Sequence, residues 1–274
     1  MASTAVIIVT HNSAAVLEPC LSSLAGQSTP PDAVWVVDSG SAETSYLQAA
    51  EKKFGVGVLQ FPANIGFAAA NNAGFSRLGG VDHVLFLNPD TVPHHQCIQR
   101  AAESMAGNPA VGILTGRLLG YDVGGRQATG RLDSTGVFRK WYGRWFDRGQ
   151  GDVDRGQYSI PEEVPAACGA LMFCRIKALE DVLLAGRAVF DPAFFMYKED
   201  IELCLRVRKA GWTIWYEPVV AALHGRGWQR RRSRMSRAAR TMSARNEVLL
   251  YQRHPSPYIL WALAKYAAAG LLRM

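Results

Sequence analysis

Acidic side chains follow apolar runs at several points of the chain, and one such acid, Asp90, could bind a metal ion. Asp90 comes after the apolar run 84–87, separated from it by Asn88-Pro89. Pro89 ends a hydrogen-bonded strand because it has no N–H to donate. Mg²⁺ in proteins is typically held by one or two carboxylates together with substrate phosphates. Asp90 therefore either holds a divalent cation or is a turn residue that caps the next helix.

A second acidic position is suited to proton transfer. Glu199-Asp200 follows an aromatic stretch, residues 194–197. Apolar surroundings raise the pKa of a carboxyl group, and such a group can act as a general base. The alternative is that both acids stabilise the start of a helix, where negative charge is favourable. We expect Glu202, one turn further on, to face solvent.

Two further polar positions could contact a nucleotide. Asp38 ends the apolar run 34–37 and could accept a hydrogen bond from a base or ribose, as acids do after Rossmann strands, or it could cap a turn. His224 lies between an apolar run and Gly225-Arg226, so it could bind a metal or phosphate, or be a buried core residue. Trp228 could pack over this site or lie on the surface. Neither a G-x-G-x-x-G pattern nor a P-loop lysine is present, so we expect neither dinucleotide nor kinase chemistry.

The elements that must position these residues alternate in type along the first third of the chain. Apolar runs predict strands at 5–10, 34–37, 57–61 and 84–87, and helical periodicity predicts helices at 13–26, 44–54, 68–78 and 97–105. Ser13 is expected to cap the first helix. This alternation predicts an α/β fold, with one Rossmann-like, mostly parallel central sheet and helices on both faces. Ligands bind such sheets at the carboxyl ends of the strands, where Thr10-His11-Asn12, Asp38 and Asp90 converge.

The rest of the chain has a less regular pattern. Residues 116–161 show little periodicity and predict long loops or an irregular hairpin, and a helix at 199–210 and a short strand at 212–216 follow. Helical patterns return at 235–251 and in the apolar segment 258–272. We therefore expect a catalytic domain at 1–225, with a nucleotide-binding half at 1–115 and an acceptor half at 116–225. A basic helical extension is expected at 226–274.

Composition excludes several classes of protein. The chain has 274 residues, of which 49% are hydrophobic and 19% charged, so it is neither disordered nor a disulfide miniprotein. Its five cysteines are scattered without zinc spacing, which favours a reducing compartment. We find no signal peptide and no run of about 20 apolar residues that could span a membrane. These features predict a cytoplasmic protein.

The positive charge is concentrated near the C-terminus. The formal net charge is +7, and eight arginines lie between His224 and Asn246 without a single acid, which leaves −1 for the rest of the chain. Such a patch favours an anionic partner: phospholipid, a phosphorylated substrate or nucleic acid. The apolar segment 258–272 could lie on a membrane surface at the inner face of the cell membrane. The alternative is that it packs on the domain or on a second subunit of a homodimer.

Several segments, taken together and in order, resemble the inverting family 2 glycosyltransferases, and in particular the rhamnosyltransferase-like branch. Matching segments occur from residue 5 to residue 253, which makes the resemblance specific. The segments are Val9-Thr10-His11-Asn12-Ser13, Val36-Val37-Asp38-Ser39-Gly40-Ser41, 64–72, Leu87-Asn88-Pro89-Asp90, 168–172, 195–206 and Arg245-Asn246. Asn88 departs from the family pattern, because it replaces the first acid of the D-x-D metal motif.

The resemblance implies a GT-A fold, C-terminal helices, a nucleotide-sugar donor and a divalent cation, Mg²⁺ or Mn²⁺. It assigns Asp200 as the catalytic base with Glu199 beside it, and Asp90 and His224 as metal ligands. The donor site implied by the resemblance comprises Thr10, His11, Asn12, Asp38, Asn64, Gly66, Asn72, Asn88 and Arg226.

The resemblance also favours dTDP-L-rhamnose as donor, with UDP-sugars and GDP-sugars as alternatives. The acceptor would be a hydroxyl of a cell-surface polysaccharide or of a lipid-linked glycan. Two other classes compete with this hypothesis: a nucleotide-sugar-binding protein without turnover, and a nucleic-acid-binding protein that uses the arginines. No helix-turn-helix, zinc finger or RNA-binding motif supports the second, so we expect no nucleic-acid partner.

Overall fold

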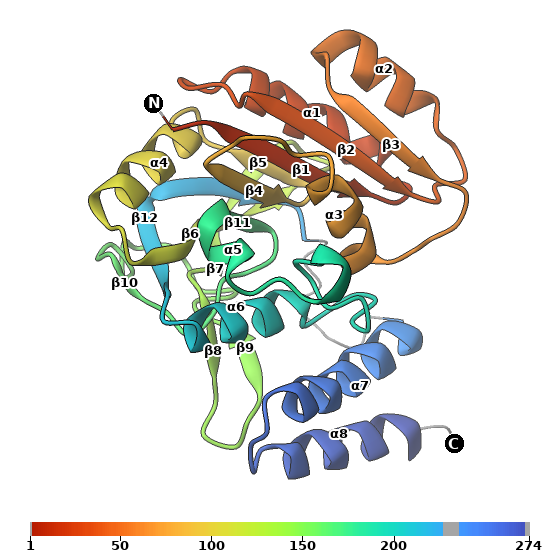
Figure 1. The fold of residues 1–274 in the computed structure, drawn as a ribbon, viewed down its shortest axis with the longest axis vertical. Coiled ribbons are helices and arrows are strands. Elements are labelled where there is room, and N and C mark those ends of the chain that lie inside the picture. The colour runs from red at the N-terminus through yellow and green to blue at the C-terminus, as the bar shows by residue number, and fades with distance from the viewer. Residues whose placement is uncertain (1, 227–235, 272–274) are drawn as a thin grey trace.

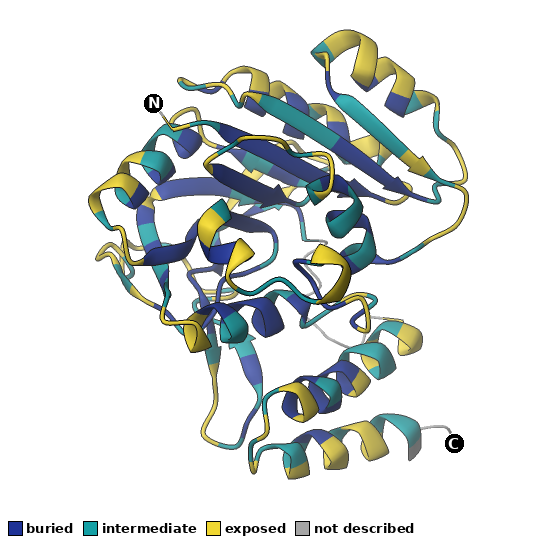
Figure 2. Cartoon of the chain, viewed as in Figure 1, coloured by how far each residue is buried: buried dark blue, intermediate teal, exposed yellow. Residues whose placement is uncertain are grey.

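A large sheet runs through the part of the chain that the computed structural model describes, residues 2–226 and 236–271 (Figure 1). Its first half is parallel, in the order β3-β2-β1-β4, and is built from β1 (Thr4–Thr10), β2 (Ala33–Ser39), β3 (Gly57–Phe61) and β4 (His83–Leu87). Every residue of β1 and of β4 is buried, as the apolar runs predict for central strands (Figure 2). The predicted parallel strands at the start of the chain are confirmed.

The second half of the sheet contains both strand directions. Beside β4 lie β11 (Leu171–Arg175), β6 (Val111–Asp122), β12 (Thr213–His224) and β10 (Glu162–Glu163), in that order. The short β5 (Thr91–Pro93) pairs with β12, and β7 (Gln127–Ser134) pairs with β6. A separate hairpin is formed by β8 (Val137–Arg139) and β9 (Trp145–Asp147).

Helices cover both faces of the parallel half. α1 (Ala14–Ala25) and α2 (Ser45–Phe54) lie on one face, and α3 (Phe67–Phe75) lies on the other (Figure 1). α1 buries the helically spaced side chains Leu17, Cys20, Leu21 and Leu24, as its sequence pattern predicts. The remaining helices before the C-terminal segment are α4 (Cys97–Gly107), α5 (Ile176–Glu180), the short 3₁₀ helix Ala185–Arg187 and α6 (Glu199–Lys209).

The C-terminal segment forms two helices packed on each other, α7 (Arg237–Arg253) and α8 (Ile259–Leu271) (Figure 1). α7 buries Asn246, Glu247, Leu250 and Tyr251, whereas α8 leaves much of its apolar surface exposed (Figure 2). Across the described ranges, no helix has the length and apolar character needed to cross a bilayer.

Two local expectations were wrong, and one of two alternatives was confirmed. The strand expected at 212–216 continues to His224, because β12 pairs along its length with β6 and again with β5. Of the two alternatives expected for residues 116–161, long loops or an irregular hairpin, the hairpin is confirmed at 116–134, where β7 pairs with β6 with shifts in register. Ser13 stands at the start of α1 without a side-chain cap, since its hydroxyl contacts the backbone of His11.

Candidate active site

Asp38 and Thr10 meet at the carboxyl edge of the sheet. They are register partners on β2 and β1, and Thr10 Oγ1 donates to Asp38 Oδ1 at 3.0 Å. The Asp38 carboxylate also accepts from Ser41 N at 2.9 Å and from Tyr46 OH at 3.1 Å, and the residue is only 1% exposed. The carboxylate therefore holds the loop after β2 in place. Its contact with a nucleotide base stays a prediction.

His11 and Asn12 form the exposed rim of the same edge. His11 Nδ1 lies 2.8 Å from the carbonyl oxygen of Ser39, so the ring proton belongs on Nδ1. Nε2 can then accept from Asn12 Nδ2, which is 3.2 Å away. Asn12 Oδ1 accepts from Ala42 N at 2.9 Å. Both side chains are thus fixed in position beside solvent, where a ligand can reach them.

The segment after β3 joins the donor side of the site to the base. Asn64 Oδ1 accepts from Ser39 Oγ at 3.1 Å and from Gly66 N at 2.9 Å. Gly66 has a φ of 84°, and a Cβ on it would lie 2.5 Å from the carbonyl oxygen of Phe195. Glycine is therefore required where α3 approaches the segment that precedes α6.

The geometry does not support the expected donor contact of Asn72. Its Nδ2 donates to Phe190 O at 2.8 Å, and its Oδ1 accepts from Val189 N at 3.0 Å and Phe190 N at 2.9 Å. The amide is thus used in holding the backbone at 189–190. We assign it a structural role, which the asparagine-rich sequence of this segment does not reveal.

Asp90 and His224 lie side by side, as expected for a shared metal site. His224 Nε2 is 3.4 Å from Asp90 Oδ1, and Asn88 Nδ2 is 3.5 Å from the same nitrogen. His224 is 2% exposed, and its Nδ1 is 2.7 Å from Asp133 Oδ2, which fixes the ring. Burial alone would lower the pKa of His224, but the hydrogen bonds to Asp133 and Asp90 raise it to about 9.

These residues fit a divalent cation that is completed by a ligand. An imidazole nitrogen and a carboxylate face the same point, and a carboxylate behind the imidazole is the usual support of a metal-bound histidine. Nowhere in the described residues do three or more His, Cys, Asp or Glu side chains group to hold a metal. The protein would therefore supply Asp90 and His224, and substrate phosphates and water would supply the other ligands.

Arg226 connects the metal end of the site to the base end. Its Nη1 donates to Asp147 Oδ2 at 2.7 Å, its Nε is 3.9 Å from Asp133 Oδ2, and its Nη2 donates to Cys168 Sγ at 3.4 Å. Burial favours the neutral form of Asp133, but the His224 hydrogen bond and the Arg226 charge outweigh it and lower the pKa of Asp133. A chain of alternating charges therefore runs inward from Asp90.

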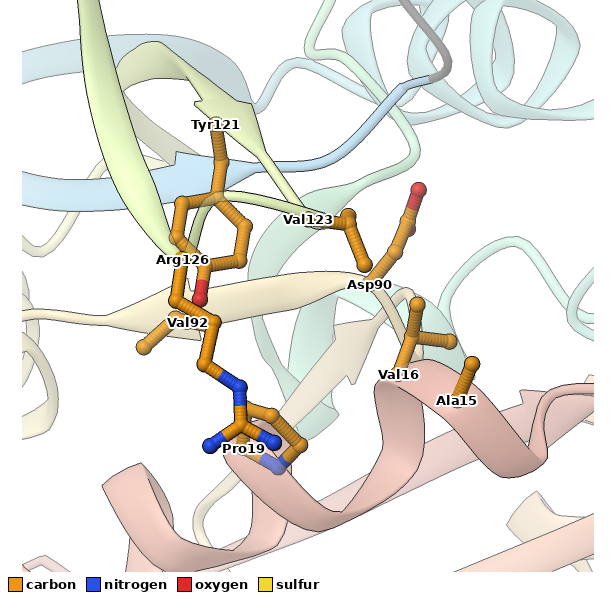
Figure 3. A pocket seen from close by; sticks show the side chains of 8 residues that line it. All are labelled: Ala15, Val16, Pro19, Asp90, Val92, Tyr121, Val123 and Arg126. Carbon is orange, nitrogen blue, oxygen red and sulfur yellow. The ribbon is translucent and has the colours of Figure 1, made fainter.

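The tip of the β6–β7 hairpin closes the outer side of Asp90. Val123 at this tip, together with Val16 of α1, lines a small hollow beside Asp90 (Figure 3). The hollow has a volume of about 10 Å³, which is room for about one water molecule. Arg126 extends over Pro19, away from the Asp90 carboxylate (Figure 3).

Asp200, the predicted base, is held at the start of α6 by two backbone amides. Its Oδ2 accepts from Gly169 N at 3.0 Å and its Oδ1 from Ile201 N at 2.8 Å, and the side chain is partly exposed. Burial raises the pKa of Asp200, and the charge of Asp147 raises it further. Gly169 follows Cys168, so this contact completes the link from Asp90 to Asp200.

Glu199 points into the protein. It is 6% exposed, its Oε2 has no hydrogen-bond partner, and burial followed by the Asp200 charge raises its pKa to about 8. Glu202 is also buried, at 2%, which corrects the expectation of a solvent-facing residue. It pairs with Arg206 at 2.8 Å and with His254, directly after α7, at 3.3 Å.

Two carboxylates of the site were missed from the sequence, Asp133 at the end of β7 and Asp147 at the end of β9. Both stand in the stretch without clear periodicity. Asp147 follows the aromatic pair Trp145-Phe146, a local signal that could have found it, whereas Asp133 follows only Leu132 and has no such signal. Trp228 and the arginines at 230, 231, 232 and 234 lie outside the described residues.

Known proteins similar to this chain identify its family. The model of glycosyl transferase family 2 matches residues 5–183. An N-acetylglucosaminyl-diphospho-decaprenol L-rhamnosyltransferase of Mycobacterium tuberculosis is 26% identical over 234 residues, 80% of this chain and 75% of that protein. A pre-mycofactocin glycosyltransferase of the same organism is 29% identical over 225 residues, 80% of this chain but 42% of that protein.

Solved structures show the same fold. GalNAc-T7 with UDP, GalNAc and Mn²⁺ matches 92% of this chain and 48% of its own, with a TM-score of 0.68 and 15% identity. A mannosyltransferase of Pyrobaculum calidifontis with GDP-Man and Mn²⁺ matches 98% and 74%, with a TM-score of 0.63 and 20% identity. The sheet described above is therefore that of the GT-A glycosyltransferases. Because the family model covers more than half of its length, this chain belongs to glycosyl transferase family 2.

Proposed function

We propose that this glycosyltransferase inverts configuration as it moves L-rhamnose from dTDP-L-rhamnose to a hydroxyl of a polysaccharide or lipid-linked glycan. The continuous chain of contacts from Asp90 and His224 through Asp133, Arg226 and the 168–169 backbone to Asp200 carries the proposal. This chain of contacts supports a single site in which the leaving diphosphate and the attacking hydroxyl lie close together. The rhamnosyltransferase relative favours this donor, and a UDP-sugar is the alternative.

In the proposed reaction, Asp200 takes the proton of the acceptor hydroxyl. The hydroxyl oxygen forms a bond to the anomeric carbon, while the bond from that carbon to the diphosphate oxygen breaks and its electron pair leaves with the nucleoside diphosphate. Arg226 offers positive charge to the leaving diphosphate. A divalent cation bound by Asp90 and His224, Mg²⁺ or Mn²⁺, would supply Lewis-acid stabilisation of the same charge.

The donor class can be tested by thermal unfolding with dTDP, UDP, GDP and CDP, each with and without Mn²⁺ or Mg²⁺. A ligand at 100 times its Kd stabilises a protein by about 2.7 kcal/mol. We expect a metal-dependent shift with dTDP. A shift confined to UDP or GDP would change the donor, and no shift with any nucleotide would contradict the proposal and favour a protein without donor binding.

The base is tested by Asp200→Asn. This variant should lose most of its turnover, measured as release of nucleoside diphosphate from the sugar donor, and should keep nucleotide affinity. Asp181→Asn, which changes an acid on the surface near α5, is the matched control and should leave both quantities unchanged. Near-normal turnover by Asp200→Asn would show that another group takes the proton.

We further propose a cytoplasmic enzyme whose extension, residues 226–274, touches an anionic membrane surface. α8 exposes Leu260 at 71% and Leu263 at 46%, and Trp141 of the nearby hairpin is 85% exposed. Interfacial helices combine such apolar faces with basic residues, and Arg237 and Arg240 are exposed on α7. Sedimentation with phosphatidylglycerol vesicles, but not with phosphatidylcholine vesicles, is expected, and Leu260→Ser should weaken it. Dimerisation without vesicle binding would instead assign this face to a second copy of the chain.

A further inference from the structure

The backbone turn before the catalytic acids has an uncommon conformation. Tyr197 and Lys198 both have a φ of 77°, and they immediately precede Glu199-Asp200. Residues with a side chain rarely adopt positive φ, and two in succession persist only where the surrounding structure imposes them. Something outside the turn must therefore hold it in place.

The backbone carbonyls of this turn show which groups hold it. The carbonyl oxygen of Phe195 accepts from Phe67 N at 2.7 Å, which ties the turn to the start of α3 on the donor side. The next two carbonyls, of Met196 and Tyr197, accept from a single side-chain amide, Asn246 Nδ2, at 2.9 and 3.0 Å. Hydrogen bonds from two elements that are remote in sequence, α3 and α7, thus hold the turn.

Asn246 is well suited to this task. It lies on α7, is fully buried, and presents both N–H bonds of its amide to neighbouring carbonyls. Other contacts between α7 and the catalytic part avoid the turn: Arg253 pairs with Asp191 at 2.7 Å, and His254 contacts Glu202 at 3.3 Å. Asn246 therefore acts on the turn, whereas those residues attach the helix as a whole.

We propose that Asn246 is a positioning residue for Asp200, and that α7 of the C-terminal extension is thereby part of the catalytic machinery. By holding the carbonyls of Met196 and Tyr197, it keeps the turn in the conformation that directs the Asp200 carboxylate toward Gly169 N. The proposal rests on the proposed function in that Asp200 is taken as the base.

Two variants and one control test this inference. Asn246→Ala removes both N–H donors, and Asn246→Asp keeps the shape but turns an acceptor oxygen toward two carbonyls. Arg253→Ala cuts an attachment of the same helix that does not touch the turn. We expect kcat to fall at least tenfold in both Asn246 variants and less than threefold in Arg253→Ala. The Kd for dTDP with Mn²⁺ should stay within twofold in all three.

Hydrogen exchange supplies a readout that is independent of catalysis. In both Asn246 variants, exchange should accelerate in residues 196–202 and at the amide of Gly169, which loses its Asp200 acceptor, and should be unchanged there in Arg253→Ala. This measurement needs no substrate. If the protein shows no turnover, the proposed function is refuted, but hydrogen exchange still tests the positioning role of Asn246. Unchanged exchange in residues 196–202 would overturn the inference.

A rescue variant separates positioning from general stability. Lys198→Gly removes the penalty of positive φ at one of the two strained residues, so it should restore at least half of the lost kcat when combined with Asn246→Ala. If Asn246→Ala alone does not fold, recovery of a folded protein in the double variant would support the proposal. Failure of the double variant to recover either property would overturn it.

Discussion

Replacing Glu199 by glutamine should stabilise the protein at neutral pH. Glu199 is 6% exposed and its Oε2 has no partner, so the fold holds it as a neutral acid, with a pKa raised by burial and then by Asp200 to about 8. In the unfolded chain the same group ionises near 4.5. Glutamine has nearly the same shape and does not ionise, so it removes this difference between the two states.

The size of the effect follows from the two pKa values. Between about pH 4.5 and pH 8 the folded protein binds a proton that the unfolded chain has lost, so stability falls as pH rises through this range. pH 7 lies about 2.5 units above the pKa of Glu199 in the unfolded chain and below its pKa in the folded protein. At about 1.36 kcal/mol per unit, this costs the folded protein about 3 kcal/mol of stability. Glu199→Gln should therefore gain up to about 3 kcal/mol at pH 7 and nothing at pH 4.

Urea unfolding at a series of pH values, followed by tryptophan fluorescence, measures this quantity. Glu202→Gln is the matched control, because Glu202 is on the same helix and equally buried but is paired with Arg206 and His254. Burial favours its neutral form, yet its hydrogen bonds to His254 and Arg206 prevail and lower its pKa. The ionised Glu202 carboxylate therefore stabilises the fold above pH 4.5, and this stabilisation is lost as pH falls. Glu202→Gln should destabilise the protein at neutral pH by about 3–5 kcal/mol.

The two variants must therefore change stability in opposite directions at pH 7. Equal destabilisation by Glu199→Gln at every pH would show that the carboxyl makes a contact that glutamine cannot replace. A wild-type stability that rises steadily from pH 5 to pH 8 would refute the reasoning, because it would mean that Glu199 is ionised in the folded protein at little cost.

Three further outcomes follow from the site. Asp133→Asn should weaken Mn²⁺-dependent nucleotide binding by about 10–100-fold, measured by calorimetry, because it removes the carboxylate that orients His224; binding without metal should not change. Gly66→Ala should lower the free energy of unfolding by about 1–3 kcal/mol, because Gly66 has a φ of 84° and a Cβ there would meet Phe195 O. The control Gly79→Ala places its Cβ in open space and should be neutral or slightly stabilising. All five thiols are buried in the folded protein, so a disulfide reagent at pH 8 should modify them only after unfolding; rapid labelling of Cys168, whose pKa burial raises, would contradict its position under Arg226.

The sequence predicted the parallel half of the sheet because local signals suffice there. Each of β1 to β4 is a short apolar run between turn residues, and the structure places all four within one or two residues of their expected bounds. The polar residues that end these strands meet at one edge because parallel strands share their direction. Asp38 and Asp90 could therefore be assigned to a site without knowledge of the remaining fold.

Where contacts between distant segments decide the structure, the sequence was less informative. The length of β12 depends on pairing with β6 and β5, and the pairing of His224 with Thr91 is what brings His224 beside Asp90. Glu202 was expected at the surface because the local pattern shows nothing of distant segments, and His254, directly after α7, contacts it. Asp133 and Asp147 stand on β7 and β9, in a stretch without a clear period.

The two ends of the site therefore differ in what maintains them. The proposed metal end is built at strand termini, where β12 pairs with β5, and Asp133 and Arg226 support it from behind. The base end depends on a strained turn that α3 grips from one side and α7 from the other. A division of the chain at residue 225 consequently separates Asp200 from Asn246, which holds the turn before it. On the proposed role of Asn246, α7 of the extension belongs to the catalytic unit even if α8 also meets a membrane.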